Sequence, residues 1–293
     1  ATDDNYSFTQ EDGYSSDCGS AYVPMRYTAN KQYEGGTEGM KVSEVWNSYH
    51  TNNGAHGELK TYRYSDKGTL GSEGQGSYDY ETSITYTGNE KKHILSLPSD
   101  VRVLSSDGTL YHHVSATYDT DYANHITRLT QQLDDGNAVT DYEYDKYGNI
   151  TQKTLPANSK GQRMWYRYRY EPVMNMYPER VDDAWGYRSE NENFDYRYGI
   201  ALLRRDINNY YFETEIDNLG RITKMRAPNE IATGADYTIA FDYHSKAQTS
   251  QNDITAPAYA VTRHYDVQHP DDDVETVTFI DGFGRPIDRK SVV

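Results

Sequence analysis

The sequence predicts an almost wholly β protein, a strip of antiparallel β-hairpins with few or no helices. Tyrosine supplies 30 of the 293 residues, and many tyrosines lie two residues apart, which places them on one face of a strand. Leucine and alanine are scarce while Thr, Val and Ile are common, a composition that favours strands over long helices. Tyrosine-rich segments also end in Asp-x-x-Gly turns that recur along the chain, which indicates a repeat architecture.

The tyrosine pairs suit a broad sheet that has no thick leucine core. An aromatic ring buries roughly 150–250 Å² and a cross-strand pair adds roughly 0.2–1 kcal/mol, so stacked rings can hold strands together. The phenol groups remain free to face water. We therefore expect a large, curved, single-layer sheet.

Two regions follow one another along the chain. Residues 1–60 are rich in Gly, Ser, Thr, Asn and Asp, and we expect short strands or loops there. Residues 61–293 form the predicted hairpin region. The segment 41–47 fits a short helix or a strand, and both remain open. Residues 62–70 show a strand-turn-strand pattern with its turn at 66–68.

Period-two segments and tight turns then alternate. From residue 78 to residue 86 every second residue is aromatic or β-branched. Residues 95–104 and 110–118 flank Asp107-Gly108, and Asp-Gly between strand-like segments is a strong hairpin signal. A second such turn is predicted at 135–137. Strands joined by tight turns give an antiparallel meander.

A common turn unit appears in three places, as Asp145-Lys-Tyr-Gly148, Asp217-Asn-Leu-Gly220 and Asp281-Gly-Phe-Gly284. The first Asp can accept bonds from backbone N–H groups two residues on, and the Gly can adopt positive φ without strain. We expect a hairpin turn at each unit, with no chemistry required of the Asp. The bulky third residues are expected to pack against neighbouring hairpins; they are Tyr147, Leu219 and Phe283.

These units resemble the YD or RHS repeat family, named for its Tyr-Asp dipeptide. The matching segments are Tyr144-Asp145-Lys-Tyr-Gly148-Asn149, Ile216-Asp217-Asn-Leu-Gly220-Arg221 and Asp281-Gly-Phe-Gly284-Arg285-Pro286. The third is similar to strings found in the shell components of insecticidal toxin complexes and in polymorphic toxins. Weaker copies at 64–68 and 118–119 extend the resemblance to about residues 60–293.

The resemblance implies a long β-strip that spirals into a hollow shell around a toxin or another cargo. It implies a much larger bacterial polypeptide, secreted or on the cell surface, whose remaining repeats and cargo are the partners of this chain. The sequence departs from the family in lacking a recognisable RHS core, which forms a self-cleaving aspartyl protease, and an appended toxin domain. We therefore assign no catalytic residue and expect a structural module, an internal or N-terminal piece of the strip, and not an enzyme.

Exposed aromatic rings leave a second interpretation open, a carbohydrate-binding or adhesin module. Its candidate glycan-stacking residues are Trp46, Trp165 and Trp185. A third interpretation is a glycoside hydrolase on a β scaffold, which needs paired carboxylates in a cleft. With 45 acidic residues, such pairs arise by chance and do not indicate catalysis by themselves.

The net charge of -16 opposes binding to phosphate backbones, and no run of Lys or Arg offsets it locally. Arg167 and Arg169 alternate with tyrosines, an arrangement that would suit a stacking platform for single strands. A strand with Arg on one face and Tyr on the other accounts for the same pattern. We expect no nucleic-acid partner.

Cys18 is the only cysteine, which excludes an internal disulfide and a cysteine-based zinc site. It has no evident basic neighbour, so we expect an inert thiol. No apolar run approaches the length of a membrane-spanning helix, and we expect no membrane span.

Two groups of residues have metal-binding chemistry without a recognised metal-binding spacing. They are His264 and His269 with residues 271–273, and His50 and His56 with Glu58. Residues 271–273 also supply oxygen ligands for calcium, but without the EF-hand spacing. We expect no metal and no cofactor.

Overall fold

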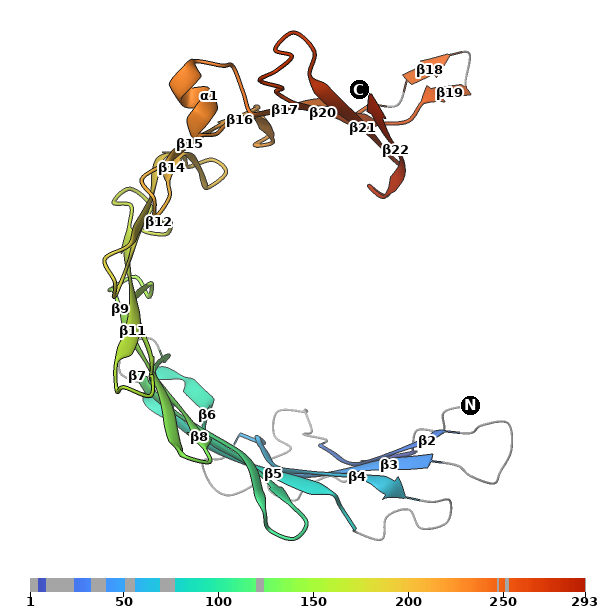
Figure 1. Ribbon diagram of the computed structural model, residues 1–293. Helices are drawn as coiled ribbons and strands as arrows, with labels where there is room; N and C mark the ends of the chain where they lie inside the picture. The colour runs from blue at the N-terminus through green and yellow to red at the C-terminus, as the bar shows by residue number, and fades with distance from the viewer. Residues whose placement is uncertain are drawn as a thin grey trace. The chain divides into compact units, whose positions relative to one another are not determined.

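The computed structural model describes residues 5–8, 24–32, 41–50, 56–68, 77–119, 124–246, 248–250 and 253–292. Its contacts divide the chain into two units, Ala1–Met164 and Trp165–Val293. Each unit contains a single-layered antiparallel sheet (Figure 1). The prediction of an all-β strip of hairpins is confirmed. Cys18 lies outside the described residues, and the proposed boundary near residue 60 stays a prediction.

The first unit is a meander in which successive strands pair antiparallel. A short 3-10 helix, Glu90–Lys92, joins β5 to β6. The strands are β1 (Asn5–Phe8), β2 (Met25–Gln32), β3 (Lys41–Tyr49), β4 (Leu59–Gly68), β5 (Tyr80–Asn89), β6 (Ile94–Ser105), β7 (Leu110–Asp119), β8 (His125–Leu133), β9 (Gly136–Tyr144) and β10 (Ile150–Ala157).

The structure of this unit tests several of the strands and turns predicted from the sequence. The segment 41–47, left open between helix and strand, lies in β3, and the hairpin around Asp107-Gly108 is confirmed. The turn expected at 66–68 is wrong, because β4 continues and Gly68 pairs with Val42 beyond a register shift. The turn expected at 135–137 lies earlier, since Leu133 already pairs with Gly136.

The second unit repeats the meander through β17 and then continues with β20. Its main strands are β11 (Arg163–Tyr170), β12 (Pro178–Asp183), β13 (Arg188–Asp195), β14 (Ile200–Arg205), β15 (Tyr211–Ile216), β16 (Ile222–Arg226), β17 (Ile239–His244), β20 (Tyr259–His264), β21 (Val274–Ile280) and β22 (Pro286–Val292). A separate hairpin, β18 (Gln248–Ser250) and β19 (Asp253–Ala256), lies between β17 and β20 in the sequence.

One α-helix, α1 (Pro228–Thr233), interrupts the described part of the second meander between β16 and β17. Pro228 stands in its first turn, where the missing N–H leaves no intrahelical bond unmade. The helix ends at Gly234, whose φ of 76° is the left-handed conformation common at helix C-termini.

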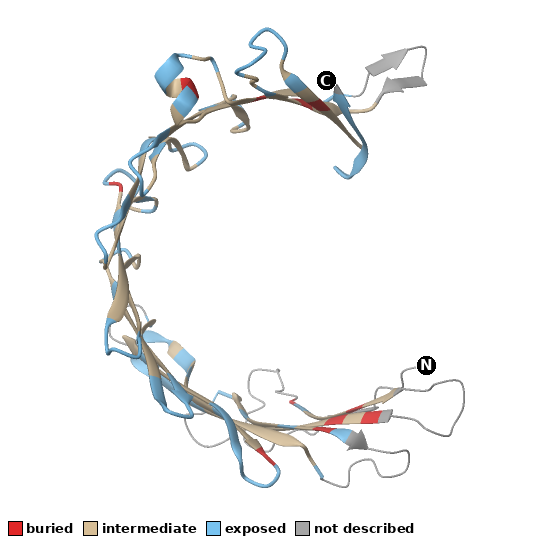
Figure 2. Ribbon diagram, in the orientation of Figure 1, coloured by how far each residue is buried: buried red, intermediate tan, exposed pale blue. Residues whose placement is uncertain are grey.

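Few side chains are buried in either sheet. Among the described residues, the buried apolar side chains of the core are Ala29, Val42, Ala240 and Val261. Successive residues of β10 and of β16 are nearly all of intermediate exposure, whereas a sheet covered on one face alternates between buried and exposed (Figure 2). Both faces of these strands are therefore partly open, and the sheets are stabilised from within their own layer.

Aromatic rings supply part of this stabilisation, as the sequence predicts. The ring of Tyr80 on β5 stacks on that of Tyr64 on β4, with centroids 5.2 Å apart. The rings of Tyr177 and Phe194 stack at 5.7 Å in the second unit. Such cross-strand pairs each add a few tenths of a kcal/mol or more, roughly 0.2–1 kcal/mol.

Ion pairs along one strand and between strands supply another part. Asp141 on β9 accepts from Arg128 at 2.6 Å and from Arg163 at 2.7 Å. Asp182 on β12 likewise lies between Arg180 at 2.7 Å and Arg188 at 2.8 Å.

Arg163 is the first residue of β11 and lies near the end of the first unit, where it makes a cluster of hydrogen bonds to neighbouring backbone. Its guanidinium donates to the carbonyl oxygens of Leu155 and Val139, both at 2.8 Å, and of Thr154 at 3.2 Å, besides its bond to Asp141. A planar guanidinium with five N–H groups is suited to binding several oxygens at once. Arg163 thereby connects β9 and β10 to the beginning of β11.

Arg163→Met is expected to lower the free energy of unfolding of the first unit by roughly 1.5–3 kcal/mol, because it leaves several oxygens without their charged donor. Arg128→Met is the matched control: Arg128 shares the Asp141 partner but exposes 57% of its side chain, so it should cost less than about 1 kcal/mol. Urea unfolding followed by circular dichroism measures both. Equal losses would contradict the role given to Arg163.

His113 on β7 lies between two oxygen acceptors. Its Nε2 is 2.6 Å from the carboxylate of Asp100, and its Nδ1 is 2.8 Å from Oε1 of Gln132. Two acceptors favour the imidazolium, and the bonds to Asp100 and then to Gln132 raise the pKa of His113 above its ordinary value. Burial raises the pKa of Asp100, but its partners His113 and Arg102 lower it more, so the net shift is downward.

The raised pKa of His113 predicts a pH-dependent stability. The imidazolium stabilises the folded state fully below the unfolded pKa of about 6.5, and this contribution is lost as the pH rises through the folded value. Wild-type protein should therefore exceed His113→Gln in stability by more at pH 5.5 than at pH 8.5, as measured by urea midpoints. Exposed His112 supplies the control for the loss of a histidine, since His112→Gln removes a side chain that faces solvent and should change the urea midpoint little.

Candidate functional site: hairpin turns and aromatic rings

Asp145 organises the turn between β9 and β10. Its Oδ1 accepts from the N–H groups of Tyr147 at 2.8 Å and of Asn149 at 2.9 Å. The N–H of Gly148 donates to the Asp145 carbonyl at 3.1 Å, and Gly148 has a φ of 90°, where a Cβ would be strained. The side chain of Asn149 donates to the second carboxylate oxygen at 3.0 Å.

Asp217 and Asp281 make the same turn with arginine in place of Asn149. The Nε atoms of Arg221 and Arg285 donate to the second oxygens of Asp217 and Asp281, each at 2.7 Å. Bonds from the backbone and side chain of Arg285 lower the pKa of Asp281. At Asp217, burial raises the pKa and the bonds from Arg221 and Leu219 lower it more. Both oxygens of each carboxylate are engaged within its own turn, an arrangement that serves structure.

Sequence reasoning missed further turns with the same hydrogen bonds. Asp183-Ala-Trp-Gly186 carries the whole motif, and the same pattern search would have found it. Asn158 replaces Asp in the turn that ends at Gly161, with its amide oxygen accepting both N–H groups. In the turn that begins at Asp206, Asn209 replaces Gly and adopts a φ of 65°. Asparagine tolerates this conformation better than other residues that have a Cβ.

The expectation that bulky third residues pack against neighbouring hairpins is wrong. Tyr147, Leu219 and Phe283 expose 56%, 69% and 88% of their surface. The third residue follows the outermost peptide of the turn, so its side chain projects away from the sheet. The ring of Phe283 contacts a cation of its own turn instead, with Arg285 lying 5.4 Å from the ring centroid.

Neighbouring hairpins instead meet at the glycines. A Cβ on Gly148 would lie 2.9 Å from Cε1 of His125, and a Cβ on Gly220 would lie 2.5 Å from the ring of Tyr198. Gly199 has the same relation to Tyr177, at 2.5 Å. Glycine is therefore required here for two reasons, the positive φ of the turn and the close approach of a ring from the preceding hairpin.

Tyrosine hydroxyls near strand ends are bound to backbone and do not simply face water. Tyr144 OH donates to the carbonyl of Ile126 at the start of the preceding strand, at 2.8 Å. Burial raises the pKa of Tyr144. The same bond is made at 2.8 Å on β3, β5 and β17, by Tyr49, Tyr86 and Tyr243. On β7, the hydroxyl of Tyr118 donates at 2.7 Å to the carbonyl of Pro98, which lies within β6. In the pair Tyr144-Asp145, the tyrosine thus ties the end of β9 to the start of β8.

The three tryptophans have different surroundings. The ring of Trp46, in the first unit, lies 5.8 Å from that of Tyr27. In the second unit, the guanidinium of Arg167 lies 4.8 Å from the Trp165 ring, and Trp185 exposes 75% of its surface at a turn. Their binding to glycans stays a prediction.

Metal-binding residue types are not gathered into a metal site within the described ranges, where no group of three His, Cys, Asp or Glu side chains is close enough to hold an ion. His269 pairs with Asp266 at 2.8 Å. His50, His56 and Glu58 line a cavity together with Tyr86 and Ser96. None of the helices in the described part of the chain is long and apolar enough to cross a membrane.

The geometry defines a class of fold: antiparallel hairpins joined by Asp-x-x-Gly turns in a single-layer strip. Part of a solved structure of TcdB2-TccC3 is similar in fold: it matches 99% of this chain and 20% of its own with a TM-score of 0.70 and 12% identity. TcdB2-TccC3 without its hypervariable C-terminal region gives the same TM-score at 11% identity, covering 99% of this chain and 22% of its own. A chain of the Photorhabdus luminescens Tc holotoxin pore matches 92% of this chain and 19% of its own at a TM-score of 0.52 and 12% identity.

The expected resemblance to toxin-complex proteins is thereby confirmed at the level of the fold. No family profile and no curated protein sequence matches the chain. The chain spans about a fifth of the length of the solved chains that it matches.

Gly148→Ala tests the contact between a turn glycine and its neighbouring ring. Gly108→Ala is the matched control, because Gly108 has nearly the same φ, 88° against 90°, but would place its Cβ in open space. Both changes should cost roughly 1–2 kcal/mol of backbone strain. Gly148→Ala should cost more and displace the His125 ring, which stacks on Tyr144 at 4.4 Å.

Urea midpoints measure the stability difference between the two variants, and NMR shifts of the Tyr144 ring report the displacement. Equal destabilisation with an unchanged Tyr144 spectrum would show that this close approach does not constrain the hairpins.

Proposed function

We propose that this chain is a non-enzymatic structural segment of a large YD/RHS-repeat bacterial protein, and that it forms part of a shell around a toxin or other cargo. The proposal places the chain in a secreted or surface-exposed protein. Its partners are the remaining repeats of the same polypeptide and the enclosed cargo.

The observation that carries the proposal is the use of the polar groups in the turns. The carboxylates of Asp145, Asp217 and Asp281 are engaged by their own turns. The strand-end tyrosine hydroxyls are engaged by backbone carbonyls. These polar groups, which could otherwise act on a substrate, are hydrogen-bonded within the one-layer sheet. This is expected for a segment that forms the wall of a shell.

The fold comparisons favour the interpretation that this chain is part of the shell wall over the interpretation that it is the enclosed cargo. TcdB2-TccC3 still matches 99% of this chain when its hypervariable C-terminal region is absent. The similarity therefore lies in the part of that protein outside the hypervariable region. The carbohydrate-binding alternative rests on exposed rings such as those of Trp185 and Tyr111. Glu58 and Glu90 line one cavity among the described residues, but nothing in their contacts assigns them the acid and nucleophile roles that the hydrolase alternative needs.

Protease protection in the whole parent polypeptide tests this function. We expect segments outside the strip to resist digestion in the wild-type protein and to be cut several-fold faster when Gly148→Ala and Gly220→Ala disturb the packing of neighbouring hairpins. The matched control combines Gly108→Ala with Gly186→Ala, which have positive φ but no neighbour within 4 Å of the added Cβ. In this control variant the segments outside the strip should resist digestion as they do in the wild-type protein.

The enclosing role is overturned if the other segments are digested at one rate in all three proteins. Glycan-array binding that Trp185→Ala abolishes would favour the adhesin alternative instead.

A further inference from the structure

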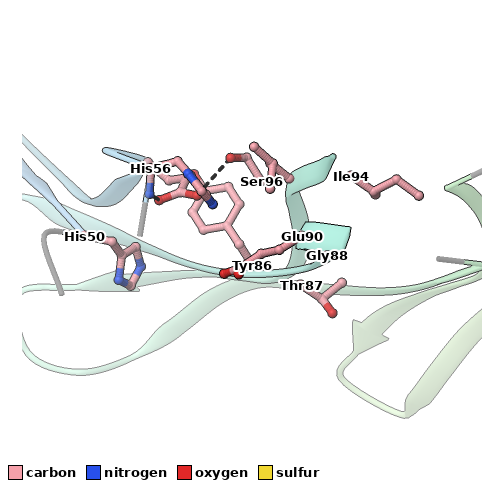
Figure 3. Close-up of a pocket in the computed structure, with 10 residues that line it drawn as sticks. His50, His56, Tyr86, Thr87, Gly88, Glu90, Ile94 and Ser96 are labelled. Carbon is pink, nitrogen blue, oxygen red and sulfur yellow. Dashed lines mark hydrogen bonds between the residues drawn. The ribbon is translucent and has the colours of Figure 1, made fainter. Parts of the chain in front are cut away.

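A cavity of about 330 Å³ lies in the first unit where the end of the β5–β6 hairpin meets the start of β4 (Figure 3). This volume is within the range of small-molecule sites, roughly 300–1,000 Å³. The residues that line it include His50, His56 and Glu58 on one side and Tyr86 and Ser96 on the hairpin. All of them belong to the first unit.

The hairpin that walls the cavity departs from regular strand geometry. A Cβ on Gly88 would lie 2.5 Å from the carbonyl oxygen of Ile94, so only glycine fits there. Ser96 and His93 adopt positive φ values of 59° and 54° without being glycine. Such conformations cost of order 1–3 kcal/mol each and cluster at ligand sites. The chain bends here and opens a concave surface.

Glu58 is fixed inside this surface. Its Oε1 accepts from the Ser96 hydroxyl at 2.8 Å, and its Oε2 accepts from the His56 N–H at 2.9 Å. Burial raises the pKa of Glu58, but these bonds lower it more, so the carboxylate stays charged. An ionised carboxylate has about four acceptor positions, and these two bonds leave others for a ligand.

Tyr86 supplies an aromatic surface beside the carboxylate. Its hydroxyl donates to the Leu59 carbonyl at 2.8 Å. Its ring packs edge to face with the His50 ring, with centroids 5.9 Å apart. The lining also contains Glu90 and the apolar side chains of Ile94 and Leu95, and it contains no Lys or Arg. The cavity therefore combines negative charge, an aromatic ring and a short apolar stretch.

We propose that this cavity binds an organic cation, an ammonium or guanidinium group carried on a short alkyl chain. The cation pairs with Glu58 through charge-assisted hydrogen bonds and lies against the Tyr86 ring, while the alkyl chain contacts Ile94 and Leu95. A free amine and a basic side chain of a peptide present the same chemistry. This cation site would add a binding function to the proposed structural role in a shell. The proposal of the site does not depend on whether the strip encloses a cargo.

Titration of the whole 15N-labelled chain with n-butylguanidinium and n-butylammonium tests the site by NMR. We expect saturable shifts at the backbone amides of His56, Gly88 and Ser96. The affinity should fall with added salt and fall at least about tenfold in Glu58→Gln, because a charged partner is replaced by a neutral amide of the same shape. Glu192→Gln is the matched control: it removes one exposed negative charge in the other unit and should bind as wild type does.

Ser96→Ala is a second variant that keeps the charge but removes one bond that orients Glu58, and it should weaken binding several-fold. The tripeptide acetyl-Gly-Arg-Gly-amide distinguishes the two sources: tighter binding than n-butylguanidinium indicates a peptide side chain, and weaker binding indicates a free amine.

The proposal is overturned if these amides show no saturable shift, if Glu58→Gln binds equally well, or if n-butanol or methyl glucoside binds as tightly as the cations.

Discussion

The structure depends on one constraint: within the described residues no second layer covers either sheet, so stabilising contacts must come from inside one layer. Hydrophobic burial, the main driving force for compact domains, is correspondingly small here, with few side chains such as Ala29 and Val42 fully buried. Directional contacts take its place. Backbone ladders, ring pairs, ion pairs and turn hydrogen bonds each contribute little, but they recur along the chain.

The pair Tyr144-Asp145 joins two of these contacts at one point in the chain. Tyr144 ties the end of β9 to Ile126 at the start of β8, and Asp145 then closes the turn to β10. At the β15–β16 turn the link continues outward, because Arg221, held by Asp217, lies 4.3 Å from the ring centroid of Tyr243 on β17. The β15–β16 turn is therefore connected both to its own hairpin and to the next strand.

Much of the fold could be predicted from the sequence, because period-two tyrosines and Asp-x-x-Gly turns are local signals. The positions of Asp145, Asp217 and Asp281 needed only turn chemistry. Contacts between hairpins could not be predicted in the same way. The close approach of Tyr198 to Gly220 depends on how adjacent hairpins stack, and neither residue alone shows it. The continuation of β4 through Gly68 was missed for a similar reason, since pairing with Val42 overrides a local turn signal.

The difference between regular and irregular hairpins explains where residues suited to binding a ligand are found. In the regular hairpins, polar groups are used by the repeat, so little remains for a ligand. The end of the β5–β6 hairpin follows no Asp-x-x-Gly rule: a 3-10 turn, Glu90–Lys92, replaces the tight turn, and Ser96 takes a positive φ. That departure brings a charged Glu58 and the Tyr86 ring to one cavity. In a chain built from repeats, a side chain can be positioned to bind a partner where the structure departs from the repeat.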